Sequence, residues 1–103
     1  MGTAKSIVNP ADLVDRVAKR AAKRFRPDVI RIRYSIGEDW FGDPSIFFRI
    51  LLSSGASRFE NLGKVMDPIR TWIKDALSDL DHIVYFDVRS EEEQEELKDP
   101  QWD

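Results

Sequence analysis

The spacing of apolar residues changes several times along the chain, and each change predicts a new element. From Pro10 to Pro27 apolar side chains recur every three or four positions, which is typical of an amphipathic helix. Asn9 is a favourable N-cap, and Pro10 fits the first turn of a helix. We therefore expect the first helix to begin at Asn9–Pro10 and to end before Pro27.

Two strands are expected after this helix. Residues 29–36 alternate strictly between apolar and polar positions, which indicates a strand with one face toward water. Residues 45–53 are apolar on one face and partly apolar on the other, which predicts a central strand. Residues 37–44 are dense in turn formers and are expected to form a loop. The apolar face of the first strand consists of Ile30, Ile32, Tyr34 and Ile36.

In the second half of the chain, the spacing of apolar residues predicts a helix, then a strand, then another helix. A helix is expected over residues 57–80, opened by a capping box that begins with Ser57 and interrupted near Pro68. Residues 83–88 predict a third strand, and residues 90–98 predict an acidic helix.

The resulting order is α-β-β-α-β followed by an acidic C-terminal helix. We expect an α+β fold, a two-layer sandwich in which a small mixed sheet carries both main helices on one face. The 103 residues suit a single domain. Within it we expect a flexible lead over residues 1–8, a core over residues 9–89 and an acidic tail over residues 90–103.

Composition excludes several classes of function. The chain has no cysteine and one histidine, which excludes disulfides, thiolate nucleophiles and multi-His metal sites within one chain. It has no apolar run long enough to span a membrane, and its first residues do not follow the order of a secretory signal. We therefore expect a cytoplasmic protein that makes no membrane contact and requires no cofactor.

Charge is strongly segregated along the chain. Residues 1–36 contain nine Lys/Arg and three Asp/Glu, whereas residues 37–103 contain seven and sixteen. Such segregation favours a charged partner or self-association, but the total of −3 makes nucleic acid a less favoured partner than protein. The candidate partner contacts on the basic side of the first helix are Arg16, Arg20 and Arg24.

The element order and the stretch from Ile32 to Leu52 resemble the minimal nucleotidyltransferase family. In that family a Gly-Ser pair follows the first core strand, and an Asp-x-Asp pair on the next strand binds magnesium. Here the Gly-Ser pair is missing, and Ser45 and Phe47 stand at the carboxylate positions. Without that pair, magnesium loses its ligands on this strand. The resemblance therefore implies a catalytically degenerate copy, of the kind paired with helical HEPN-domain proteins in toxin–antitoxin-like systems.

The loop over residues 37–44 (GEDWFGDP) holds the least ordinary residues. Trp40 and Phe41 are either a lid folded over the sheet edge or exposed anchors for a partner. Asp39 and Asp43 are the candidates for binding a hard cation, although their spacing does not match a calcium-binding loop.

The acidic tail carries two large apolar side chains, Leu97 and Trp102. A helix this polar is either mobile or docked through those two residues. Its charge suits a basic surface, and we favour that of a partner over the chain's own first helix or a second copy.

We interpret the chain as a non-catalytic protein-interaction module, an antitoxin-like or regulatory partner of a helical protein, with homo-oligomerisation left open. The first alternative is a nucleotidyltransferase-type enzyme with displaced metal ligands such as Asp39 and Asp43. The second is an RNA-binding domain that uses the basic first helix. His82 lies at the expected end of a helix, where a capping role is more common than catalysis.

Overall fold

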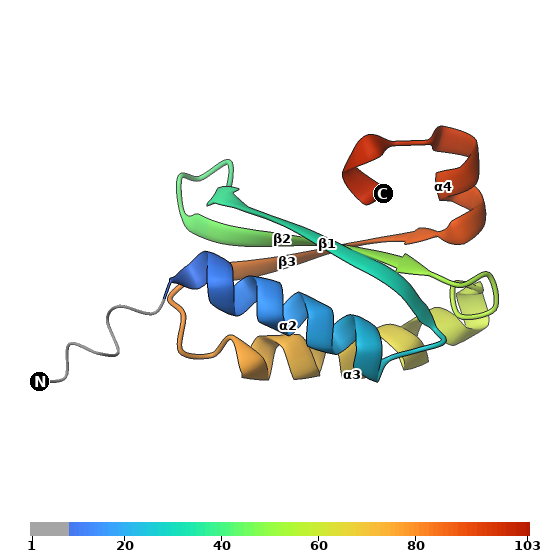
Figure 1. The fold of residues 1–103 in the computed structure, drawn as a ribbon, viewed down its shortest axis with the longest axis horizontal. Helices are drawn as coiled ribbons and strands as arrows, with labels where there is room; N and C mark the ends of the chain where they lie inside the picture. The colour runs from blue at the N-terminus through green and yellow to red at the C-terminus, as the bar shows by residue number, and fades with distance from the viewer. Residues whose placement is uncertain (1–8) are drawn as a thin grey trace, which may run out of the picture.

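The structure, a computed structural model, describes residues 9–103, which form a sheet with its two long helices packed on one side (Figure 1). The expected flexible lead, residues 1–8, lies outside the described residues. The elements in chain order are α2 (Pro10–Arg24), β1 (Val29–Glu38), β2 (Pro44–Leu52), α3 (Phe59–Ala76), β3 (Ile83–Ser90), α4 (Glu91–Leu97) and the 3-10 turn η1 (Pro100–Trp102). None of the described helices is long and apolar enough to cross a membrane.

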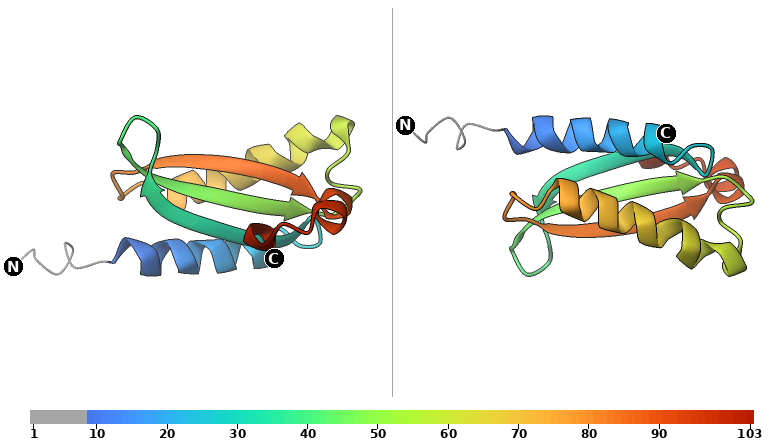
Figure 2. Two further views of the ribbon diagram at one scale, coloured as in Figure 1. Left: turned by 90° about the horizontal axis from the view of Figure 1, so that it is seen from above. Right: turned by 90° about the horizontal axis from the view of Figure 1, so that it is seen from below.

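The sheet is mixed, as predicted, and has the order β1-β2-β3. β1 and β2 pair antiparallel through the hairpin loop, and β3 pairs parallel to β2 after the crossover through α3. Both long helices cover the same face, and α4 and η1 lie on the opposite face (Figures 1 and 2). The predicted α+β fold with both main helices on one face is therefore confirmed.

The hydrophobic core lies between the central strand and the helices. β2 is buried on this side at every second residue, and both helices contribute an apolar stripe. Burial on this scale supplies the main driving force for a chain without disulfides. The fully buried side chains of the core include Ile46, Phe48, Ile50, Leu52, Val14, Met66, Ile69 and Ile73.

A β-bulge at the start of β1 changes which residues face the core. The register against β2 shifts between Val29 and Arg31, so Ile30 is an extra residue in the strand. Val29 is consequently buried and Ile30 is exposed, which is the reverse of the strict alternation predicted for them. Ile32 and Tyr34 beyond the bulge face the helices as expected.

The helix starts follow the sequence at two places and depart from it at one. The Asn9 side chain caps α2 by accepting a hydrogen bond from the Ala11 N–H, and Ser90 opens α4 with a capping box, both as predicted. The capping box expected at Ser57 is absent, because α3 begins two residues later with Arg58 as its N-cap and no side-chain bond. α3 then runs through Pro68 without a second cap.

Candidate functional site

The face of the sheet opposite the helices, called the open face, is divided into two halves. Strand register aligns Ser35, Phe47 and Tyr85 in one row, and Arg33, Arg49 and Asp87 in the next. The hairpin loop, which carries Trp40 and Phe41, lies at one end of this face, and the chain's last residues cover the other end (Figure 1). We call Trp40, Phe41, Phe47 and Tyr85 the aromatic patch, and Arg31, Arg33, Arg49 and Arg89 the arginine cluster.

Asp39 holds the hairpin loop in a single shape. Its carboxylate accepts hydrogen bonds from the Phe41 N–H at 2.9 Å, the Asp43 N–H at 3.0 Å and the Tyr85 hydroxyl at 2.8 Å. Gly42 has a φ of +84°, a conformation that suits glycine and lets the chain turn back into β2. A side chain that was a candidate cation ligand therefore bonds the protein's own loop and β3.

The two loop aromatics extend into solvent from this fixed loop. Trp40 is 74% exposed and Phe41 is 76% exposed, so neither folds over the sheet as a lid. Each of these rings packs against the next one along the open face. The ring centroids are 5.8 Å apart for Phe41 and Trp40, and 5.4 Å apart for Trp40 and Tyr85. Tyr85 in turn stacks on Phe47 with centroids 5.3 Å apart. The result is a continuous aromatic surface whose outer half is accessible to a partner.

Hydrogen bonding keeps Asp39 ionised. Burial alone would raise the pKa of Asp39, but the donors from Asp43, Tyr85 and Phe41 outweigh it, and the pKa lies below its ordinary value of 3.8. The same contact raises the pKa of the Tyr85 hydroxyl. Both shifts favour the carboxylate–phenol pair seen in the loop.

We predict that the loop loosens only in acid. Because the pKa of Asp39 is lower in the folded protein, its contribution to stability is complete above 3.8 and is lost as pH falls through the lowered pKa. Near-UV circular dichroism of the aromatic patch, followed during acid titration, should therefore change in that range. Asp39→Asn should remove this transition, whereas Asp43→Asn should keep it, since no hydrogen bond is made by the Asp43 side chain within residues 9–103. The same transition in both variants would contradict the assignment.

The positions that resemble the metal-binding pair of nucleotidyltransferases do not present carboxylates to solvent. The buried Ser45 hydroxyl donates to the Asp43 carbonyl at 2.9 Å, and the Phe47 ring stacks on Tyr85. Over residues 9–103 no group of three or more His, Asp or Glu side chains is placed to hold a metal ion.

The arginine cluster binds the chain's own C-terminal residues. The guanidinium groups of Arg49 and Arg31 donate to the main-chain carbonyls of Gln101 at 2.8 Å and Trp102 at 3.2 Å, and Arg33 donates to that of Asp103. Three arginines from two strands thus contact three successive carbonyls. This segment crosses the open face above the sheet (Figure 2).

Trp102 anchors the C-terminal segment to the open face. It is 3% exposed, and the Arg89 guanidinium lies 4.4 Å from its ring centroid, which is favourable cation–π geometry. Arg89 also donates to the Gln94 side chain at 3.0 Å and lies 3.6 Å from the Asp99 carboxylate.

The predicted docking through two apolar side chains is only half right. Trp102 docks, but Leu97 is 60% exposed and contributes little. The surface that receives the segment is the chain's own sheet, which was not among the expected candidates. The reason is geometric: arginines at alternate positions of separate strands form one surface only after the strands pair.

The basic side of α2 is a separate surface in the helical layer. Arg16 and Arg20 are exposed, and the Arg24 guanidinium lies 5.8 Å from the Phe25 ring centroid and 5.9 Å from that of Trp72. α2 lies on the side of the sheet opposite the open face (Figure 1).

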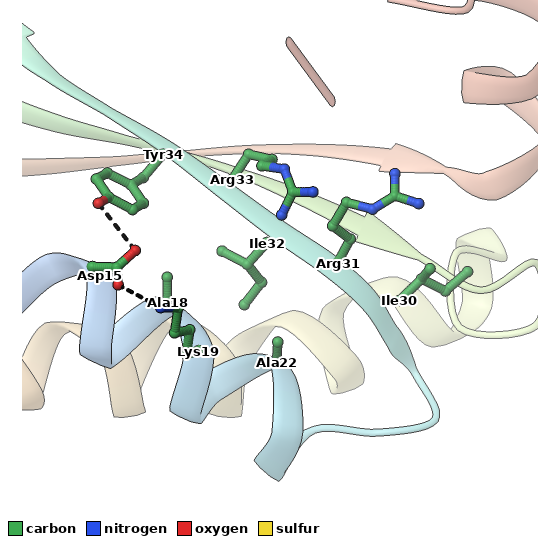
Figure 3. Close-up of a pocket in the computed structure, with 9 residues that line it drawn as sticks. All are labelled: Asp15, Ala18, Lys19, Ala22, Ile30, Arg31, Ile32, Arg33 and Tyr34. Atoms are coloured by element: carbon green, nitrogen blue, oxygen red, sulfur yellow. Dashed lines mark hydrogen bonds and ion pairs between the residues drawn. The ribbon is translucent and has the colours of Figure 1, made fainter. Parts of the chain in front are cut away.

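Polar contacts bridge the groove between α2 and β1. The Tyr34 hydroxyl donates to Asp15 at 3.2 Å, and Lys19 pairs with the same carboxylate at 2.8 Å (Figure 3). The hydrogen bond from Lys19 lowers the pKa of Asp15. Arg31 extends away from α2, so the basic side of the helix does not continue onto β1.

A shallow hollow of about 320 Å³ lies between the aromatic patch and the C-terminal segment. Its lining includes Phe47 and Tyr85 on one side and Arg49 and Gln101 on the other, with Asp87 between them. It makes the two halves of the open face one continuous surface.

Two residues that β3 contributes to the open face were not identified from the sequence. Tyr85 and Arg89 lie at alternate positions of β3, and that alternation could have shown their common face. No hydrogen bond joins His82 to Ser78, Asp79 or Asp81 within residues 9–103, and its Nδ1 is buried without a partner there.

Comparison of the sequence with protein-family models gives no match, and no curated protein matches it.

Proposed function

We propose that the protein is a non-catalytic binding module that docks a partner protein on its aromatic patch. The observation that carries this proposal is the fixed loop: a buried carboxylate orders the chain so that Trp40 and Phe41 stand out in solvent. Exposed aromatic side chains in a rigid setting are typical of interface anchors, because little conformational entropy is lost when they bind.

Protein is a better match than nucleic acid for this surface. The Phe47 and Tyr85 rings lie within 10° of parallel and stack on each other, so the faces they share are not available to bases. The net charge of −3 also disfavours attraction of a phosphate backbone.

Site-specific photo-cross-linking in cells tests the proposal. A benzophenone amino acid at position 41 should form a discrete adduct with one protein. The matched control is position 59, because Phe59 is 94% exposed at the start of α3 and lies outside the open face. An adduct at both positions, a nucleic-acid adduct, or no adduct at position 41 would contradict the proposal.

The resemblance to minimal nucleotidyltransferases supplies one candidate for the partner, a helical HEPN-domain protein encoded beside this chain. On this proposal the chain acts as its antitoxin-like or regulatory subunit. Mass spectrometry of the adduct decides this narrower point: a helical protein from the neighbouring reading frame supports it, and any other protein contradicts it.

We predict that the purified chain transfers no nucleotide to that partner. Ser45 and Phe47 occupy the positions where the resemblance would place metal-binding carboxylates, and Asp39 is engaged by its own loop. Labelled ATP with magnesium and the cross-linked partner should give no modified product. Label transfer that Asp39→Ala or Asp43→Ala abolishes would show that displaced ligands support catalysis.

A further inference from the structure

We propose that the arginine cluster is a binding site for an acidic peptide of the partner protein. Residues 91–103 occupy that site in the isolated chain as an internal ligand. The proposal rests on the proposed function in that it takes the partner to be a protein. It adds a second contact on the open face and states the chemistry of the partner segment.

The contacts themselves identify a peptide ligand. Arg49, Arg31 and Arg33 donate to main-chain oxygens of three consecutive residues in and directly after the 3-10 turn η1, and any polypeptide that adopts such a turn offers the same oxygens. Trp102 adds one side-chain anchor beneath Arg89. A foreign segment with one aromatic residue in a similar 3-10 turn can make the same set of bonds.

Charge favours an acidic ligand. Residues 91–103 contain seven acids and one lysine, and the remaining residues have a net charge of +3, whereas the whole chain has −3. The internal ligand therefore neutralises a surface that would otherwise attract anionic segments. Its Asp99 and Asp103 carboxylates lie 3.6 Å from Arg89 and 3.7 Å from Arg31.

The internal segment is attached in a way that allows exchange. Trp102 is the only buried apolar side chain in the last thirteen residues, and most of the others are exposed and polar. A segment held by one buried apolar side chain opens at a lower free-energy cost than the core of the fold. The hollow beside Arg49 and Gln101 leaves the edge of the segment accessible from the aromatic patch.

On this proposal the partner binds the aromatic patch first and the arginine cluster second. A partner that docks on Trp40 and Phe41 brings its own acidic segment beside the hollow. Attachment through the aromatic patch raises the local concentration of that segment, so it competes with the internal ligand. The internal segment keeps the arginines covered until such a partner arrives.

The test uses a fluorescein-labelled peptide with the sequence of residues 91–103 and fluorescence anisotropy. Trp102→Ala in the full chain should loosen the internal ligand, and this variant should bind the peptide at least about tenfold more tightly than the wild-type chain. Adding Arg33→Gln and Arg49→Gln to it should weaken binding by about tenfold or more. Adding Arg16→Gln and Arg20→Gln on α2 removes the same charge and should leave binding nearly unchanged.

Wild-type protein provides a second readout that does not depend on the Trp102→Ala variant being folded. Excess peptide should speed hydrogen exchange of amides in residues 94–103, as the internal segment is displaced. No acceleration there, or equal weakening by both arginine pairs, would overturn the proposal. Tighter binding of an oligouridylate than of the peptide would overturn the peptide assignment and favour single-stranded nucleic acid. Since none of these probes requires Trp40 or Phe41, the outcome is independent of the cross-linking test at position 41.

Discussion

Trp102→Ala is expected to destabilise the protein by about 3 kcal/mol, at the low end for loss of a buried tryptophan. The side chain is 3% exposed and holds the C-terminal segment on the open face. The cost stays at the low end because the segment can detach rather than leave an empty cavity. Urea unfolding measures the free-energy change, and hydrogen exchange should show faster exchange across residues 94–103.

Leu97→Ala is the matched control for this prediction. Leu97 belongs to the same segment but is 60% exposed, so its replacement should change the free energy of unfolding by less than about 0.5 kcal/mol. Equal losses for Leu97→Ala and Trp102→Ala would show that Trp102 is not the anchor. Unchanged exchange in the segment would lead to the same conclusion.

Trp40→Ala is expected to weaken binding of the cross-linked partner by about 2 kcal/mol, roughly 30-fold in Kd. The side chain is 74% exposed and makes its main contact with Tyr85, so its removal should leave the thermal midpoint nearly unchanged. Calorimetric titration of the purified partner gives the affinity, and differential scanning calorimetry gives the midpoint.

Phe59→Ala removes an equally accessible aromatic residue from α3 and should change neither quantity. If Trp40→Ala lowers the midpoint by several degrees and leaves Kd unchanged, the loop aromatics support the fold rather than an interface. If both variants weaken binding alike, the partner does not select the aromatic patch.

The layered fold was predictable from sequence because each main element has a clear apolar period. α2 carries a single apolar stripe behind a recognisable cap, and β2 is apolar on both sides, as befits the middle of a sheet. The predicted start of α3 was wrong, because the Ser57 hydroxyl donates to the Ser54 carbonyl instead of capping the helix. Turn formation and helix capping compete for the same side chain.

The open face was less predictable because it depends on register between strands. A bulge at Ile30 reverses the alternation that the sequence suggests for the start of β1. The arginine cluster brings together residues up to 58 positions apart, from Arg31 to Arg89, and no local pattern predicts which of them the C-terminal segment will meet. The binding site of the C-terminal segment therefore exists only once the strands have paired.

The hairpin loop was partly predictable from sequence. Trp40 and Phe41 are exposed, which excludes the lid interpretation, and their contact with a partner stays a prediction. Asp39 was considered only as a cation ligand, because its partner Tyr85 lies on β3, far along the chain. Its role in shaping the loop depends on β3, which the sheet places beside the loop.

The most direct test of the account is a hydrogen-exchange footprint of the chain bound to the cross-linked partner. We predict protection of amides in residues 39–47 and 83–87, which form the aromatic end of the open face, with exchange in α2 (Pro10–Arg24) unchanged. Protection confined to α2, with the loop and β3 exchanging as in the free chain, would contradict the assignment of the aromatic patch as the partner-binding surface.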